Sequence, residues 1–192
     1  MPVSSWYLCT TKEFDGEGNA MSTNTAHQSL VKAKEEGDRR WFYGGGLHIW
    51  KATAEETNGA FILFEDRMDF GKVTPLHIHA DSDETMIVLE GEIRMHLDGT
   101  EHIVGEGGVA SAPRGVPHAF KVSGADGARL LCLHTPGCCQ AFYWDASEPV
   151  ASDDTRGLHA GPVDMGRVQA SAAKNGGIEI LGPPPFAEVP RA

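Results

Sequence analysis

Three histidines and one glutamate lie in two short segments at spacings that suit a metal site. His77 and His79 are separated by one residue, and on a β-strand such residues project from the same face because side chains alternate. A short polar turn follows, and Glu84 opens the next predicted strand, where its carboxylate can return to the same point. A turn rich in glycine and proline delivers His118 at the start of another strand.

Three imidazoles and one carboxylate favour a transition metal over Mg²⁺ or Ca²⁺. A lone His-x-His pair is weak evidence, because two polar residues on a solvent-facing strand give the same pattern, but the second segment strengthens it. Asp83 competes with Glu84 as the carboxylate ligand. We predict one divalent transition metal per chain (Ni, Fe, Mn, Co, Cu or Zn). Four protein ligands leave two open positions in an octahedral site, which is the form of a catalytic centre.

Short strands must position these residues. From Trp41 to Pro136 the hydrophobic pattern has a period of two, and glycine and proline punctuate it, which predicts an all-β sandwich or barrel. Asp98-Gly99 between two alternating runs predicts a tight hairpin. The expected strands include residues 47–51, 60–64, 85–89, 92–97, 100–104, 109–112, 118–122 and 128–135.

Helical patterns flank the strands. The capping-box spacing of Thr25 and Gln28, with Gly37 as a C-terminal stop, predicts a helix over residues 25–37. A second helix is predicted over 164–175, followed by a short strand near 178–181, whereas 147–162 is predicted to be a loop. We divide the chain into an N-terminal extension with a short helix (1–46), a barrel (47–136) and a C-terminal helix and strand extension packing on the barrel (137–192).

Composition and charge exclude several classes of protein. The chain has 192 residues and a net charge of −11, which disfavours nucleic acid and anionic membranes as partners. No apolar run approaches the roughly 20 residues of a membrane-spanning helix. The first residues lack the pattern of a signal peptide, and the four cysteines show no paired spacing. We therefore expect reduced thiols and a cytoplasmic location.

The two histidine segments resemble the cupin motifs. The first, G-x5-H-x-H-x3,4-E-x6-G, is matched by five residues, and the second, G-x5-P-x-G-x2-H-x3-N, by four. Val122 stands where the second motif has Asn, a position that is not a ligand. The resemblance covers about residues 47–135 and implies a single jelly-roll barrel with a metal bound by His77, His79, Glu84 and His118. The matching residues are Gly71, His77, His79, Glu84 and Gly91, then Gly107, Pro113, Gly115 and His118.

Within the cupins, the chain looks like single-domain relatives of flavonol (quercetin) 2,4-dioxygenases. The residues that carry this resemblance are Leu89–Glu92, Pro113–Phe120 and Ile178–Pro185. It implies a dioxygenase that takes an enolisable aromatic substrate and O2. Glu84 would then be both ligand and general base, because it is the one ionisable group among the ligands able to accept the substrate proton.

The pocket of such an enzyme would be lined by residues that share a face with the ligands. Met86 and Val88 share a face with Glu84, and Phe120 shares one with His118. His134 on the last barrel strand is a further pocket candidate. Each of these four residues has the alternative of an ordinary core position. An apolar lining of this kind favours a flat aromatic substrate.

Three classes of function remain open from the sequence. The first is the metal-dependent dioxygenase, the second a non-redox metal cupin acting as an isomerase, cyclase or lyase, and the third a small-molecule-binding cupin. Oxygen uptake separates the first from the second, and turnover of any kind separates both from the third. We also expect a homodimer, since cupin-like barrels often pair through sheet edges.

Overall fold

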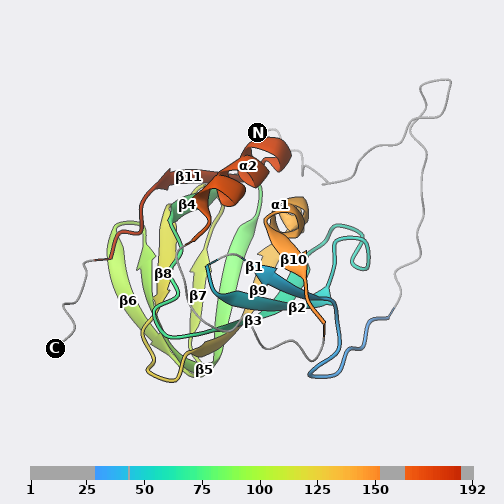
Figure 1. The fold of residues 1–192 in the computed structure, drawn as a ribbon, viewed down its shortest axis with the longest axis horizontal. Helices are drawn as coiled ribbons and strands as arrows, with labels where there is room; N and C mark the ends of the chain where they lie inside the picture. The colour runs from blue at the N-terminus through green and yellow to red at the C-terminus, as the bar shows by residue number, and fades with distance from the viewer. Residues whose placement is uncertain (1–28, 43, 152–162, 187–192) are drawn as a thin grey trace, which may run out of the picture.

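The structure, a computed structural model, describes residues 29–42, 44–151 and 163–186. Eleven strands and two helices lie in these ranges (Figure 1). The strands are β1 (Arg39–Phe42), β2 (Gly46–Ala52), β3 (Ile62–Met68), β4 (Leu76–His79), β5 (Asp83–Leu97), β6 (Thr100–Gly105), β7 (Val109–Ala112), β8 (His118–Val122), β9 (Ala128–Thr135), β10 (Ser147–Pro149) and β11 (Ile178–Gly182). The helices are α1 (Gln140–Asp145) and α2 (Met165–Asn175).

All strand pairs between named strands are antiparallel, and they follow the order β10-β1-β2-β3-β9-β5-β8-β4-β11, with β6 and β7 also paired to β5. The long strand β5 belongs to both faces of the barrel. Its first half pairs with β9 and β7, and its second half pairs with β8 and β6. The chain therefore has the all-β antiparallel barrel that we expected, with short helices at one end (Figure 1).

The bend in β5 depends on a glycine. The register with β9 shifts between Val88 and Glu90, and Gly91 has a φ of 79°. A Cβ atom at Gly91 would lie 2.2 Å from the carbonyl oxygen of Gly127, so the backbones approach too closely for any side chain. This bend lets the first half of β5 present Glu84 to the barrel interior while the second half closes the opposite sheet.

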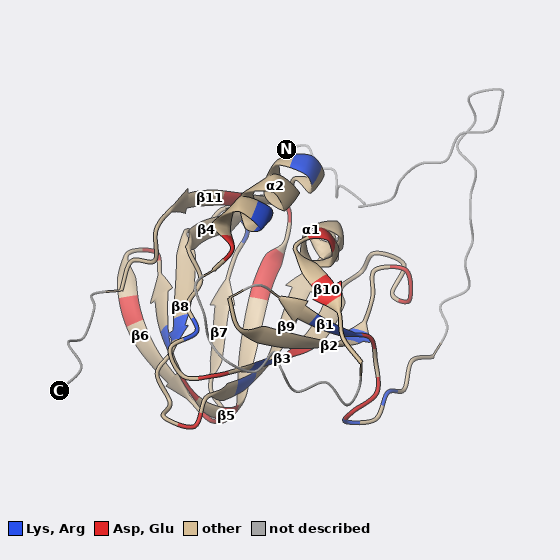
Figure 2. Cartoon of the chain, in the orientation of Figure 1, with Lys and Arg blue, Asp and Glu red and all other residues tan. Residues whose placement is uncertain are grey.

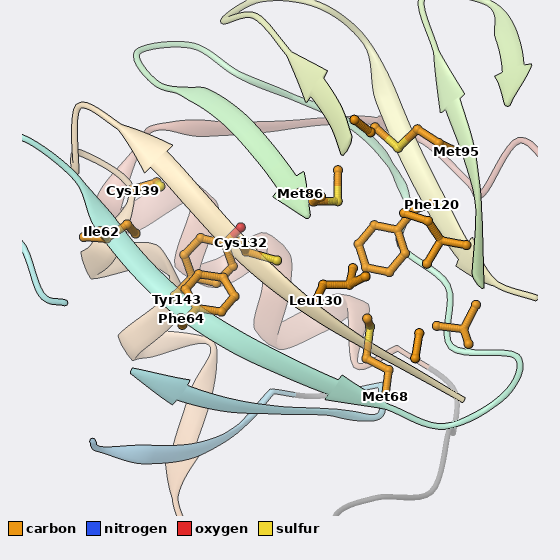
Figure 3. Packing of buried hydrophobic residues seen from close by; sticks show 14 of the residues in the cluster. Ile62, Phe64, Met68, Met86, Met95, Phe120, Leu130, Cys132, Cys139 and Tyr143 are labelled. Atoms are coloured by element: carbon orange, nitrogen blue, oxygen red, sulfur yellow. The ribbon is translucent and has the colours of Figure 1, made fainter. Parts of the chain in front are cut away.

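The barrel is filled by apolar side chains from both faces (Figure 3). Met86, Met95 and Leu130 are fully buried, and Phe64 stacks edge-on against Tyr143 with ring centroids 5.0 Å apart. Tyr143 comes from α1, so this helix covers one end of the core. The interior position expected for Met86 and Val88 is confirmed.

The C-terminal elements match their predictions closely. Asp164 caps α2 by accepting a hydrogen bond from the Arg167 amide at 3.0 Å, and Gly176 ends the helix with a φ of 66°. β11 then pairs with β4, and the unpredicted β10 pairs with β1, which corrects the loop expected at Ser147. Helix α1 was also not predicted. The three-part division of the chain stays a prediction.

The helix predicted over residues 25–37 is wrong where the structure describes it, since residues 29–37 contain no helix. The proposed capping residues lie outside the described ranges. The Lys51 ammonium of β2 donates hydrogen bonds to the carbonyls of Ala33, Lys34 and Glu36, and Lys32 pairs with Glu56 at 2.7 Å. These tertiary contacts take the carbonyls that a helix would use, and they dock the segment on β2.

The charged residues are spread over many elements (Figure 2). Lys and Arg occur on α2, β8 and β1, and Asp and Glu occur along both sheets. Among the described residues, no helix is long and apolar enough to cross a membrane.

Candidate metal centre

Strands β4 and β8 bring three imidazoles together inside the barrel. His77 and His79 project from the same face of β4, and His77 is directly opposite His118 in β8. The ring centroids of His77 and His118 are 4.3 Å apart, and those of His79 and His118 are 5.3 Å apart. Alternation along β4 and one cross-strand pair thus fix the geometry of the three rings.

Glu84 reaches the same point from the start of β5. Its Oε2 atom is 2.8 Å from His118 Nε2 and 3.4 Å from His79 Nε2. One donor atom from each of His77, His79, Glu84 and His118 lies within 4.8 Å of the others. All four residues are buried, with exposed fractions of 8% or less. We name these four residues the His/Glu cluster.

The hydrogen bonds of the His/Glu cluster fit a metal ion. The Nδ1 atoms of His77 and His118 each lie 2.8 Å from a backbone carbonyl, of Pro75 and Val116 respectively. A carbonyl only accepts, so each Nδ1 carries a proton and each Nε2 is directed to the cluster. Neither ring nitrogen of His79 has a hydrogen-bond partner among the residues that the structure describes, although both are buried. Buried polar groups are normally hydrogen-bonded, so a buried imidazole that lacks a partner and lies beside a carboxylate fits the role of a metal ligand.

The charges of the His/Glu cluster are coupled. Burial opposes ionisation of Glu84, but the hydrogen bond to His118 and the nearby imidazoles of His134 and His79 outweigh it and hold the pKa of Glu84 well below its usual range. Burial also disfavours charge on His118, yet its contact with Glu84 raises the pKa of His118. Burial and the neighbouring rings of His118 and His79 lower the pKa of His77 to about 3. Glu84 and His118 therefore each favour the charged form of the other.

Asp83, the competing carboxylate, points away from the His/Glu cluster. It accepts hydrogen bonds from the backbone amide of Arg114 at 2.9 Å and from its guanidinium at 3.1 Å. Adjacent residues on a strand face opposite sides, so only one of Asp83 and Glu84 can face the interior. The structure brings Glu84 to the histidines.

The side chains of His134 and Tyr143 extend the contacts of Glu84. His134 of β9 is fully buried, and its Nε2 atom lies 3.6 Å from Glu84 Oε1 and 3.2 Å from the Tyr143 hydroxyl. Burial lowers the pKa of His134 to about 3. The sequence predicts His134 as a pocket residue. It does not point to Tyr143, because nothing in the order of residues shows that α1 packs over β9.

A cavity opens beside the His/Glu cluster, and it includes His77 and Glu84 in its wall. Most of the remaining wall is aromatic or aliphatic, which matches the expected apolar pocket. Phe120, a predicted pocket residue, lines this cavity, and its contact with a substrate stays a prediction. Met86, Val88 and His134 are not part of the lining and pack elsewhere in the interior. The aromatic residues of the wall are Phe42, Phe64, Phe120, Phe142 and Tyr143.

The cysteines only partly match their prediction. Cys132 and Cys139 are free and buried, and burial raises the pKa of each thiol. Cys138 is disulfide-bonded, so the expectation of reduced thiols does not hold there. Cys139 also lies with His79 and His134 in a second group whose donor atoms are within 4.8 Å of one another. This group shares His79 with the His/Glu cluster. The same nitrogen of His79 therefore cannot bind a metal ion in both groups at once.

Comparisons with known proteins agree with this fold. The model of the cupin domain family matches residues 65–134. The quercetin 2,3-dioxygenase of Bacillus subtilis (strain 168) is 30% identical over 87 residues, which cover 45% of this chain. The chain spans 26% of the length of that curated relative.

Two solved structures share the fold. KdgF from Halomonas sp. superposes with a TM-score of 0.52 at 18% identity, covering 57% of this chain and 94% of its own. A predicted oxalate decarboxylase from Thermotoga maritima gives a TM-score of 0.52 at 18% identity, covering 56% of this chain and 99% of its own. Residues 65–134 are therefore similar to the cupin domain family, and the barrel has the fold of these two structures. Over part of its length it resembles quercetinase-like proteins, and the His/Glu cluster lies within the matched residues.

Proposed function

We propose that this protein is a metal-dependent dioxygenase acting on a flavonol-like or other enolisable aromatic substrate. The observation that carries the proposal is the His/Glu cluster opening into an aromatic-walled cavity, with two imidazoles held by backbone carbonyls and the third, His79, without a hydrogen-bond partner among the described residues. The partial similarity to a quercetin 2,3-dioxygenase supports the same class of substrate. That the protein acts as a cytoplasmic homodimer stays a prediction from the sequence.

His77, His79, Glu84 and His118 would hold the metal. A divalent transition metal bound there supplies Lewis acidity, which makes a substrate hydroxyl more acidic. Glu84 accepts the released proton, because its carboxylate borders the cavity. The aromatic wall holds a flat substrate and keeps water out.

A second candidate function is a non-redox metal cupin, such as an isomerase, cyclase or lyase. The Glu84 carboxylate on the cavity wall favours this candidate, because it can take a proton from a bound substrate without oxygen. The two candidates share the His/Glu cluster and differ in whether O2 is consumed.

The first test is elemental analysis of protein purified without chelator. We expect about one transition metal per chain in the wild type and less than about a tenth of that in the His77→Ala/His118→Ala double variant, because two of four ligands are lost. His102→Ala, which changes an exposed histidine of β6, is the matched control and should keep the metal. A wild type that stays metal-free after reconstitution would contradict both candidates.

Activity then separates the candidates. Oxygen uptake on addition of a flavonol panel, lost in the double variant and kept in His102→Ala, supports the dioxygenase. Anaerobic conversion of an enolisable substrate without oxygen uptake supports the isomerase class instead and rejects the dioxygenase.

A further inference from the structure

Lys72 is a buried cation on the wall of the cavity. It belongs to the turn before β4, and only 3% of the residue is exposed. Its backbone is fixed, since its amide donates to the Asp69 carbonyl at 3.2 Å and its carbonyl accepts from the Val122 amide at 2.8 Å. The side chain therefore extends into the interior from a rigid anchor and lines the same cavity as Glu84.

The ammonium group of Lys72 has no hydrogen bond to any residue that the structure describes. It lies 5.3 Å from the centre of the Phe42 ring, a cation–π contact. The surroundings are tight, because a Cβ atom at Gly44 would lie 3.3 Å from Lys72 Nζ. The carboxylate of Asp66, which also lines the cavity, attracts Lys72 by its charge, but it forms no ion pair with it among the described residues, and its Oδ2 atom lies 3.6 Å from His48 Nε2. Burying an ammonium without a hydrogen-bond acceptor is costly, and one aromatic contact offsets only part of that cost.

A molecule in the cavity can supply the missing acceptor. We propose that Lys72 binds an anionic oxygen of an aromatic substrate, so that the cavity selects organic anions over neutral molecules of the same shape. The cavity reaches from Lys72 to His77 and Glu84, so a second oxygen of the same molecule would face the His/Glu cluster. This last part rests on the proposed function, whereas anion binding by Lys72 does not.

The charge and shape of the wall support an aromatic monoanion. Apart from histidines, Lys72 is the single basic residue among the described residues that line the cavity, and Asp66 and Glu84 are the acidic ones, so Lys72 is the place on this wall that attracts an anion. One cation suits one anionic group, whereas a sugar phosphate with two charges and many hydroxyls would find few partners on the aromatic wall. The anionic oxygen can belong to a carboxylate or to an acidic phenol, and both present the same charge to the ammonium.

The test measures binding of two matched pairs of probes to chelator-treated protein by calorimetry. 2-Hydroxybenzoate is compared with 2-hydroxybenzamide, and 4-nitrophenolate with 4-nitroanisole. A charge-assisted hydrogen bond corresponds to roughly ten- to a hundredfold in affinity, so we expect the anion of at least one pair to bind at least about tenfold more tightly. The pair that discriminates identifies the anion as a carboxylate or a phenolate.

Lys72→Met, which keeps the length of the side chain but removes the charge, should abolish this preference and leave the neutral probes bound as before. Lys121→Met on β8, which does not line the cavity, is the matched control and should keep the preference. Thermal unfolding of each variant shows whether it is folded. Equal binding of anion and neutral probe to the wild type, or an unchanged preference in Lys72→Met, would overturn the proposal.

The outcome is separable from that of the proposed function. If anion preference is present but the protein binds no metal, Lys72 keeps its role and the dioxygenase fails. If metal binds and oxygen is consumed while Lys72→Met binds and turns over substrate like the wild type, only the role of Lys72 fails.

Discussion

The cavity wall contains two buried polar regions that differ in how their charges are balanced. In the His/Glu cluster, the Glu84 carboxylate is hydrogen-bonded to His118 and lies within 3.6 Å of His79 and His134, so its charge is balanced within the fold. At Lys72, the fold supplies one aromatic ring and the charge of nearby Asp66, but no hydrogen bond among the residues described. We therefore expect the His/Glu cluster to contribute to the stability of the folded protein even without metal. Buried Lys72 should lower that stability unless an anion is bound beside it.

The substitution with the largest expected effect on the His/Glu cluster is Glu84→Gln. Removing the charge leaves His118 without its counter-ion in a buried site, and breaking a buried pair in this way costs about 3 kcal/mol or more. We expect the free energy of unfolding of the metal-free protein, measured by urea denaturation, to fall by about that amount. Glu101→Gln, at an exposed position of β6, should change it by less than about 0.5 kcal/mol. An unchanged stability in Glu84→Gln would mean that the cluster is not balanced by this carboxylate.

Lys72→Met should act in the opposite direction. Burial lowers the pKa of Lys72 from 10.5 to about 8, with Asp66 partly opposing the effect. The unfolded chain then binds the proton more tightly than the folded one between pH 8 and pH 10.5, so the stability of the wild type rises with pH across this window. We expect Lys72→Met to be more stable by about 3 kcal/mol at pH 7 and the difference to vanish towards pH 10.5.

The difference in unfolding free energy between the wild type and Lys72→Met reports on Lys72, because the other titratable groups of the cavity are present in both proteins. These are His48, Asp66, His77, Glu84, Cys132 and Tyr143. Urea denaturation of both proteins at pH 7, 9 and 10.5 measures the difference. A variant that is less stable than the wild type at pH 7 would show that Lys72 is a structural residue.

Tyr143→Phe is the mildest change and tests the edge of the His/Glu cluster. It removes the hydroxyl that lies 3.2 Å from His134 Nε2, and a single lost hydrogen bond costs about 1 kcal/mol. The ring remains to pack on Phe64, so metal content should not change. Elemental analysis and urea denaturation together check this, and loss of metal in Tyr143→Phe would extend the cluster to include the His134–Tyr143 pair.

Much of the fold follows from local pattern. Asp98 and Gly99 both take positive φ, at 48° and 78°, and form the turn of the hairpin as the sequence predicts. The predicted strands from residue 85 to residue 97 merge into one long β5, because the glycine between them bends the strand without ending it. The period of two also predicts the common face of His77 and His79, since alternation is a property of the strand itself.

Other features depend on neighbours that are far away in the sequence. The segment at residues 29–37 has helical spacing, but the side chain of Lys51 takes its carbonyls. Tyr143 reaches His134 only because α1 covers the end of the barrel. Neither the contacts of Lys51 nor the contact of Tyr143 with His134 can be predicted from local sequence pattern.

The sequence by itself determines the strands, the types and spacing of His77, His79, Glu84 and His118, and the glycine turns between them, because these depend on local geometry. The tertiary structure alone decides that Glu84 rather than Asp83 faces the histidines, that the cavity is aromatic, and that Lys72 is buried without a hydrogen bond. A lysine beside a turn is exposed in most proteins, and its burial here results from the packing of β8, Phe42 and Gly44 around it.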